Sequence, residues 1–222
     1  MTAHALLGRR VRAVIVRFAR NIRAAVIIEM AFVIPFLVLV GFGGLEIANL
    51  TLTTTRISQL GLNTADNASR IATGSNLAQP QVREADINDV FAGVEKQAGN
   101  LDFQQHGRII LSSLERNSDG GQWIHWQRCF GELNADSSYG EEGDGQDGTD
   151  FPGMGARGRE VTAAAGTAVM FVEIVYEYQP LLYGKWLGAK TIRSTAAFNI
   201  REARDLAQVY NPSPAATAAT CS

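Results

Sequence analysis

The feature that most constrains this chain is an apolar segment near its N-terminus. Between Ala24 and Leu45 the only charged side chain is Glu29. These 22 residues are close to the roughly 20 that a helix needs to cross a bilayer. The segment can therefore span a membrane once.

The residues before the segment predict its orientation. Residues 1–24 contain no acidic side chain and six arginines, which are Arg9, Arg10, Arg12, Arg17, Arg20 and Arg23. Because basic flanks stay in the cytoplasm, we expect an N-in topology, with everything after about residue 50 exported.

The length of the apolar segment argues against a cleavable secretory signal. Such a signal has an apolar core of about 7 to 15 residues, whereas here Glu46 follows a longer apolar run.

Glu29 is costly at this position, because a carboxylate at the centre of a bilayer helix costs about 2.5–3.5 kcal/mol. The residues around it read Ala24-Ala25-Val26-Ile27-Ile28-Glu29, followed by the apolar run from Met30. With the arginine-rich leader, this motif resembles the start of TadE-like proteins of the Tad (Flp) pilus system. The resemblance implies that a prepilin peptidase cuts between Ala24 and Ala25, although glycine is the usual residue before the cut. Glu29 would then be the fifth residue of the mature chain and would pair with an N-terminal amine.

The same resemblance implies a function in assembly. A TadE-like protein is a minor pseudopilin of the bacterial inner membrane, crossing it once with its C-terminal domain in the periplasm. Its partners would be the membrane, the prepilin peptidase, other pilins and pseudopilins, and the Tad assembly machinery. TadF-like and TadG-like proteins share this N-terminus. The alternative is an uncleaved, single-pass envelope protein whose periplasmic domain binds a ligand or partner.

Beyond the membrane segment, hydrophobic periodicity predicts two helices. Apolar residues at helical spacing predict one long helix over residues 25–73, part transmembrane and part stalk. Its threonines and Gly61 lower helix propensity, so we expect packing to stabilise it. A second, amphipathic helix is expected from Pro80 to a stop at Gly99-Asn100. Its predicted apolar stripe is Val82, Ala85, Val90, Phe91 and Val94.

Four antiparallel strands are predicted next, giving an α+β, pilin-like fold. Residues 108–115 and 122–130 flank a turn-forming stretch and read as a hairpin. Residues 170–178 and 191–201 alternate apolar and polar side chains, so each is expected to bury one face. In the second strand, the spacing of Trp123 and Trp126 predicts opposite faces, one in the core and one at the surface or in contact with a partner.

These patterns divide the chain into a leader (1–24), the long helix (25–73), a periplasmic α+β domain (74–205) and a low-complexity tail (206–222). Residues 137–158 are acidic and glycine-rich, which predicts a flexible, solvated loop. Its aspartates are three residues apart, which does not fit an EF-hand, so no metal or cofactor is predicted. The tail is expected to be poorly ordered unless Cys221 ties it down.

The two cysteines, Cys129 and Cys221, both lie on the exported side, where disulfides persist. A bridge and two separate thiols are both compatible with the sequence, because spacing does not reveal distance. The cysteines stand 92 residues apart and form no CxxC pair, so neither indicates a metal site.

The sequence contains none of the common catalytic motifs. There is no GxSxG, HExxH or P-loop, and His4, His106 and His125 are scattered. Without residues 1–24 the chain has 14 basic against 22 acidic residues, a net charge of −8, which argues against nucleic-acid binding. The sequence thus predicts a structural or assembly protein rather than an enzyme.

Overall fold

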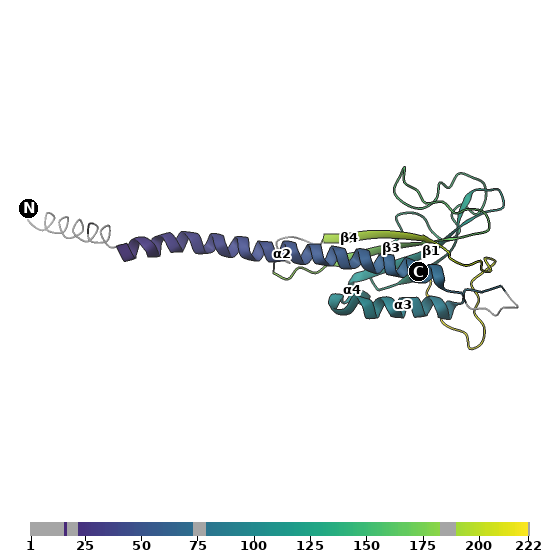
Figure 1. Ribbon diagram of the computed structural model, residues 1–222, viewed down its shortest axis with the longest axis horizontal. Coiled ribbons are helices and arrows are strands. Elements are labelled where there is room, and N and C mark those ends of the chain that lie inside the picture. The colour runs from purple at the N-terminus through teal and green to yellow at the C-terminus, as the bar shows by residue number, and fades with distance from the viewer. Residues whose placement is uncertain (1–15, 17–21, 73–78, 183–189, 222) are drawn as a thin grey trace, which may run out of the picture. The chain divides into compact units, whose positions relative to one another are not determined.

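The computed structural model describes residues 16, 22–72, 79–182 and 190–221 (Figure 1). Most of the predicted leader lies outside these residues, since only Val16 and the backbone of residues 22–24 are described. The chain divides into two units, residues 1–49 and residues 50–222.

Helix α2 (Ile22–Arg70) contains the apolar segment and the first part of the second unit. Its threonines are accommodated by bonds within the helix. Thr54, Thr55 and Thr64 each donate their hydroxyl to the carbonyl oxygen four residues earlier, at 2.7–2.9 Å. The hydroxyls are therefore satisfied without interrupting the helix.

Helix α2 ends at Arg70, three residues before the predicted end at residue 73. Arg204, from a distant part of the chain, occupies this terminus. Its guanidinium donates to the carbonyl oxygens of Ile71 at 2.7 Å and Ser69 at 3.3 Å. These bonds satisfy the carbonyls that a helix leaves unpaired at its C-terminus.

Helix α3 (Glu84–Ala98) begins four residues after Pro80, later than predicted. The preceding residues are held in an extended conformation by Tyr210, which donates to the Val82 carbonyl at 2.8 Å and accepts from the Glu84 N–H at 2.9 Å. The predicted stop is correct, because Gly99 follows the helix with a φ of 59° that favours glycine.

The apolar stripe of α3 differs from the prediction at its N-terminal end. Ala85 is exposed and Ile87 is buried in its place. The buried apolar residues recur at three- or four-residue intervals, and they are Ile87, Val90, Phe91, Val94 and Ala98. Two short helices, η1 (Gly99–Leu101) and α4 (Phe103–His106), connect α3 to the sheet.

The sheet contains the four predicted antiparallel strands, which confirms the α+β class. They are β1 (Gly107–Arg116), β2 (Gln122–Phe130), β3 (Val169–Tyr178) and β4 (Lys190–Asn199), in the order β2-β1-β3-β4. Strands β2 and β4 are thus the edges of the sheet, and β3 lies inside it.

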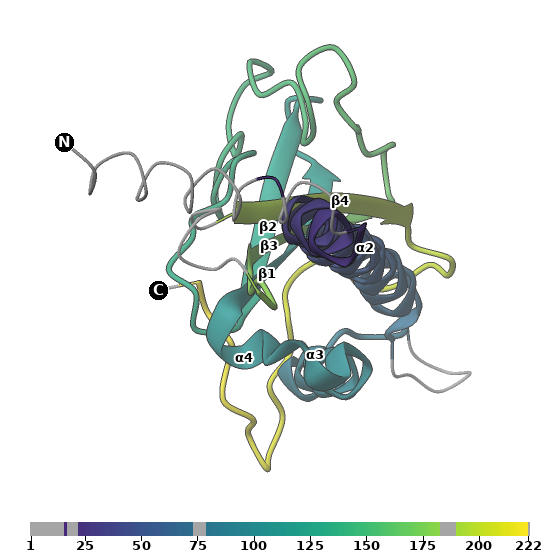
Figure 2. The ribbon, with the colours of Figure 1, turned by 90° about the vertical axis from the view of Figure 1, so that its left-hand side faces the viewer.

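One face of the sheet packs against the helices of the second unit. In Figure 2, α3 and the end of α2 lie on one side of the strands, and segment 131–168 lies on the other. Ile57, Leu60, Ala65 and Ala68 of α2 join Phe91 of α3 in the main core. Apolar side chains of all four strands complete this core, including Leu111, Trp126, Ile174 and Ile192.

The opposite face is partly covered by segment 131–168. Met154 is fully buried there, against Ile124 and Phe171. Strand β3 consequently buries both faces, and the prediction of one buried face is wrong for this strand. The acidic stretch 141–150 is largely exposed, as predicted, but the segment around it contributes to a second core.

The two tryptophans of β2 lie on the same face, contrary to the prediction. Trp126 pairs with Ser113 and Trp123 with Glu115, two residues farther along β1. The register shifts between Ser113 and Leu114, because β2 contains one extra residue, as in a β-bulge. The bulge inverts the alternation that the sequence spacing suggested.

Candidate functional site

The first half of α2 exposes a continuous apolar surface. Large side chains from Val26 to Ile47 are exposed, by as much as 77% at Phe32. Among the described residues, one helix is long and apolar enough to cross a membrane, and none of its apolar window is buried within the chain. Contiguous apolar surface of this extent indicates contact with lipid or with other helices.

Glu29 lies on this surface, four residues after Ala25 and within the same helix. Its side chain is exposed, and it makes no ion pair with another described residue. Ala24 and Ala25 are adjacent residues of α2, although the side chain of Ala24 is not among those described. The first unit thus presents one carboxylate on an otherwise apolar helix surface.

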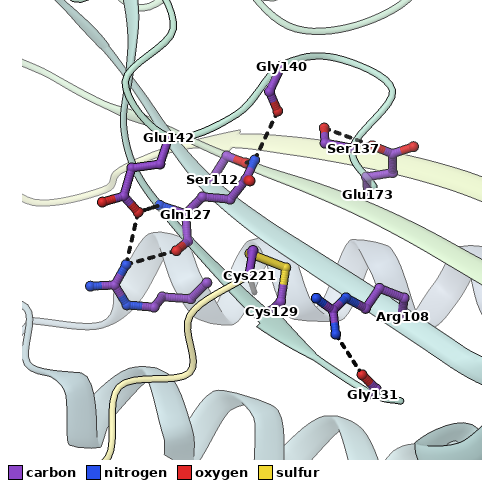
Figure 3. Close-up of a disulfide and its surroundings, with 11 residues drawn as sticks. Arg108, Ser112, Gln127, Cys129, Gly131, Ser137, Gly140, Glu142, Glu173 and Cys221 are labelled. Carbon is purple, nitrogen blue, oxygen red and sulfur yellow. Dashed lines mark hydrogen bonds and ion pairs between the residues drawn. A yellow bond between two sulfur atoms is a disulfide. The ribbon is translucent and has the colours of Figure 1, made fainter. Parts of the chain in front are cut away.

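In the second unit, Cys129 and Cys221 form a disulfide, with their α-carbons 4.9 Å apart (Figure 3). The bond joins β2 to the C-terminal tail. The tail is also held by the Cys129 N–H, which donates to the Ala219 carbonyl at 2.7 Å, and by Asn88, whose amide donates to the Thr217 carbonyl at 2.9 Å. The tail is therefore fixed at several points.

A hollow of about 370 Å³ lies beside the disulfide, on the sheet face opposite the helices. Arg108 borders it, donating through Nη1 to the Gly131 carbonyl at 2.9 Å (Figure 3). The Nε atom of Arg108 is buried and has no partner among the described residues. Asp136, Glu141 and Glu142 also line the hollow, so its walls contain both signs of charge.

A buried ion pair connects α3, β2 and the acidic loop. Arg128 donates to Glu84 through Nη2 at 2.6 Å and through Nε at 3.0 Å. Its Nη1 contacts Glu142 at 3.1 Å and the Gln127 carbonyl at 2.8 Å. The hydrogen bonds to Glu84 raise the pKa of Arg128, so this side chain stays charged.

A second buried carboxylate, Glu173, lies at the centre of β3 and is 1% exposed. It accepts hydrogen bonds from the Ser138 N–H at 2.9 Å, from Ser137 Oγ at 3.2 Å and from Arg193 at 3.0 Å. These bonds attach the acidic loop and β4 to β3. The sequence pattern indicated pairing of the glutamates of this strand with Arg193 and Arg201, but it did not predict the burial of Glu173, because alternation in β3 placed this residue on a solvated face.

Ser113, Glu115 and His125 lie together but not in the order of a catalytic triad. Ser113 Oγ donates to one Glu115 oxygen at 2.7 Å, and His125 Nδ1 lies 3.0 Å from the other. In a triad the histidine contacts the serine, whereas here the carboxylate separates the two. Ser113 is also 1% exposed, so no substrate reaches its hydroxyl.

Within the described ranges, no group of three or more His, Cys, Asp or Glu side chains could hold a metal ion. Two aspartates near the acidic loop bind backbone instead. Asp144 accepts from the Glu141 N–H and Asp119 from the Gly148 N–H, each at 2.8 Å. These carboxylates stabilise turns.

Comparison of this chain with protein-family models, with curated proteins and with solved structures gives no match. The candidate functional features are therefore identified from the sequence and the structure of this chain alone. They are the apolar surface with Glu29, the buried ion pairs, and the disulfide with its hollow.

Proposed function

We propose that this chain is a TadE-like minor pseudopilin that acts by helix packing and partner binding, not by catalysis. The observation that carries the proposal is helix α2. Its first half exposes apolar side chains and Glu29, and its second half packs in the core of an α+β domain. One helix can thus insert in a membrane and also belong to a folded exported domain.

In this proposal the arginine-rich leader stays in the cytoplasm, and the domain lies in the periplasm of a bacterium. A prepilin peptidase removes residues 1–24 and leaves Ala25 with a free amine. Glu29 neutralises that amine, on its own chain or on a neighbouring pilin. Such a pair is far stronger in an apolar environment than in water. Glu29 therefore sets the register between adjacent helices.

Mass spectrometry of the membrane-extracted protein tests the processing step. We expect an N-terminus at Ala25 in a host with an active pilus locus. An intact Met1 terminus, or a cut after Leu45, would contradict the pseudopilin proposal.

Replacement of Glu29 by Gln tests the assembly step. We expect the protein to accumulate in the membrane with its domain folded, because the arginines and the apolar run are unchanged. Pilus output should be lost. Glu95→Gln is the matched control, because Glu95 is an exposed acid on α3. This variant should assemble into pili normally. Normal pili from stable Glu29→Gln protein would show that this carboxylate is incidental.

The hollow beside Arg108 favours a second candidate, an uncleaved envelope protein that binds a ligand in the periplasm. Its volume of about 370 Å³ falls within the range of small-molecule sites. The two candidates differ at the N-terminus, so the same mass measurement distinguishes them.

A further inference from the structure

The outer edge of β4 is an unpaired row of backbone groups. The Ile200 N–H donates to the Ala168 carbonyl at 3.0 Å, one position beyond the Asn199–Val169 pair. In an antiparallel ladder hydrogen-bonded pairs alternate with non-bonded pairs, so the even-numbered residues of β4 bond to β3. The odd-numbered residues direct their N–H and C=O groups outward, and they are Thr191, Arg193, Thr195, Ala197 and Asn199.

These outward backbone groups make no hydrogen bond within the described part of the chain. The strand is accessible, because Thr191, Arg193, Thr195 and Asn199 are all exposed. An accessible edge of ten residues is a template for another strand.

The other edge of the sheet, β2, is covered. Ile124 exchanges hydrogen bonds with the loop, donating to Asp144 at 2.9 Å and accepting from Gly143 at 2.8 Å. The Gln127 N–H donates to the Glu142 carboxylate at 2.8 Å, and the Cys129 N–H donates to Ala219 at 2.7 Å. The fold therefore protects one edge and leaves the other open.

We propose that β4 binds an extended, acidic segment of another protein as a fifth strand of the sheet. The charges of the strand indicate the chemistry of this partner. Strand β4 contains Lys190 and Arg193 and no acidic side chain, whereas Arg201, just beyond the strand, already pairs with Asp66. A basic edge attracts carboxylates on an incoming strand and repels a basic one.

Arg193 can bind such a carboxylate without leaving its present partners. Only Nη1 of its guanidinium is used, by Glu173 at 3.0 Å and Ser138 at 2.8 Å. Guanidinium has five N–H donors, and the side chain is 50% exposed. Its remaining donors have no hydrogen-bond partner within the described part of the chain.

A second copy of this chain fits the edge less well. Antiparallel pairing of β4 with its copy would bring together two strands that each contain Lys190 and Arg193 and no acidic side chain. Like charges on neighbouring strands are destabilising, whereas an acidic strand compensates them.

Amide hydrogen exchange by NMR on the full chain in detergent micelles tests the proposal. The probes are short synthetic peptides that alternate valine with glutamate, or valine with lysine. At a glutamate-peptide concentration about ten times its dissociation constant, the outward amides of β4 should exchange about tenfold more slowly. The even-numbered amides should be unchanged, and the lysine peptide should protect neither set.

Two variants separate backbone pairing from side-chain contact. Thr195→Pro removes one outward N–H, which an edge strand tolerates, and should abolish the protection. Thr195→Ala keeps that N–H and should retain it. Slow exchange at the even-numbered amides of Thr195→Pro establishes that this variant is folded. If the variant does not fold, the difference in protection between the glutamate and lysine peptides on the wild-type chain tests the proposal.

Three results would overturn the proposal. The first is an absence of protection by either peptide, and the second is equal protection by both. The third is protection that needs no peptide and rises with protein concentration, since that would identify a second copy of the chain as the occupant.

Discussion

Arg128 is held by two carboxylates from different parts of the chain, Glu84 at the start of α3 and Glu142 in the acidic loop. Glu84 is 4% exposed and Arg128 is 9% exposed. We expect Glu84→Gln to lower the free energy of unfolding by about 2–4 kcal/mol. Breaking a buried ion pair costs about 3–5 kcal/mol in full, and the loss is smaller here because Glu142 remains as a partner of Arg128. Urea unfolding in micelles, followed by tryptophan fluorescence, measures the change.

Arg70→Gln provides the control for this prediction. Arg70 pairs with Asp66 on the surface of α2, and its side chain is 55% exposed. Loss of an exposed pair should cost less than about 1 kcal/mol. If Glu84→Gln costs no more than Arg70→Gln, Glu142 alone satisfies Arg128.

At the scale of elements, the strands and helices were largely predictable because each has its own periodicity. Residues 122–130 of β2 match the predicted bounds. The helix ends were less predictable, because distant residues decide them. Arg204 terminates α2, and Tyr210 delays the start of α3. Neither contact has a local signal in the sequence.

Which face of the sheet each strand side chain lies on was harder to predict, because this too depends on contacts with distant parts of the chain. The bulge in β2 inverts the alternation of Trp123 and Trp126, and segment 131–168 buries the face of β3 that was expected to be solvated. A bulge changes the side-chain face without changing the composition of the strand. Burial of Glu173 depends on Arg193 and on the loop, which are distant in the sequence.

Arg204 gives a prediction at the end of α2. Burial lowers the pKa of its guanidinium to about 10, so it is still charged at neutral pH. Arg204→Met should remove the donor of the Ile71 carbonyl and cost about 1–3 kcal/mol, while the Ser69 carbonyl keeps its bond from the Arg201 N–H at 3.3 Å. The last turn of α2 should also exchange its amide hydrogens faster than the middle of the helix.

Arg157→Met is a suitable control for Arg204→Met, since Arg157 is exposed in segment 131–168. It removes the same charge and should change neither stability nor exchange. Equal behaviour of the two variants would mean that the carbonyls at the end of α2 are adequately solvated by water.

For the whole molecule, the sequence predicted the apolar segment and Glu29 as candidate functional features, because both are local patterns. It left the pairing of Cys129 and Cys221 open, and it did not identify the buried pair of Glu84 and Arg128. Those contacts join residues 92 and 44 positions apart. They exist only once the sheet and α3 have packed.

The disulfide acts on the whole molecule, because it joins the chain end to edge strand β2. An entropy model gives about 4.7 kcal/mol for closing a loop of about 100 residues, as an upper figure. The tail keeps other contacts, including Asn88 with Thr217 and Tyr210 with Glu84. We therefore expect Cys221→Ser to lower the free energy of unfolding by about 2–4 kcal/mol while the sheet stays folded.

Reduction of the wild-type chain should reproduce the loss seen in Cys221→Ser, because both remove the same covalent bond. The double variant Cys129→Ser/Cys221→Ser controls for the free thiol that the single variant leaves beside the hollow. All three should unfold at the same urea concentration, below that of the oxidised chain. Non-reducing peptide mapping of the exported protein identifies the bond directly. Two free thiols in that map, with an unfolding midpoint insensitive to reductant, would show that the exported chain does not rely on this bridge.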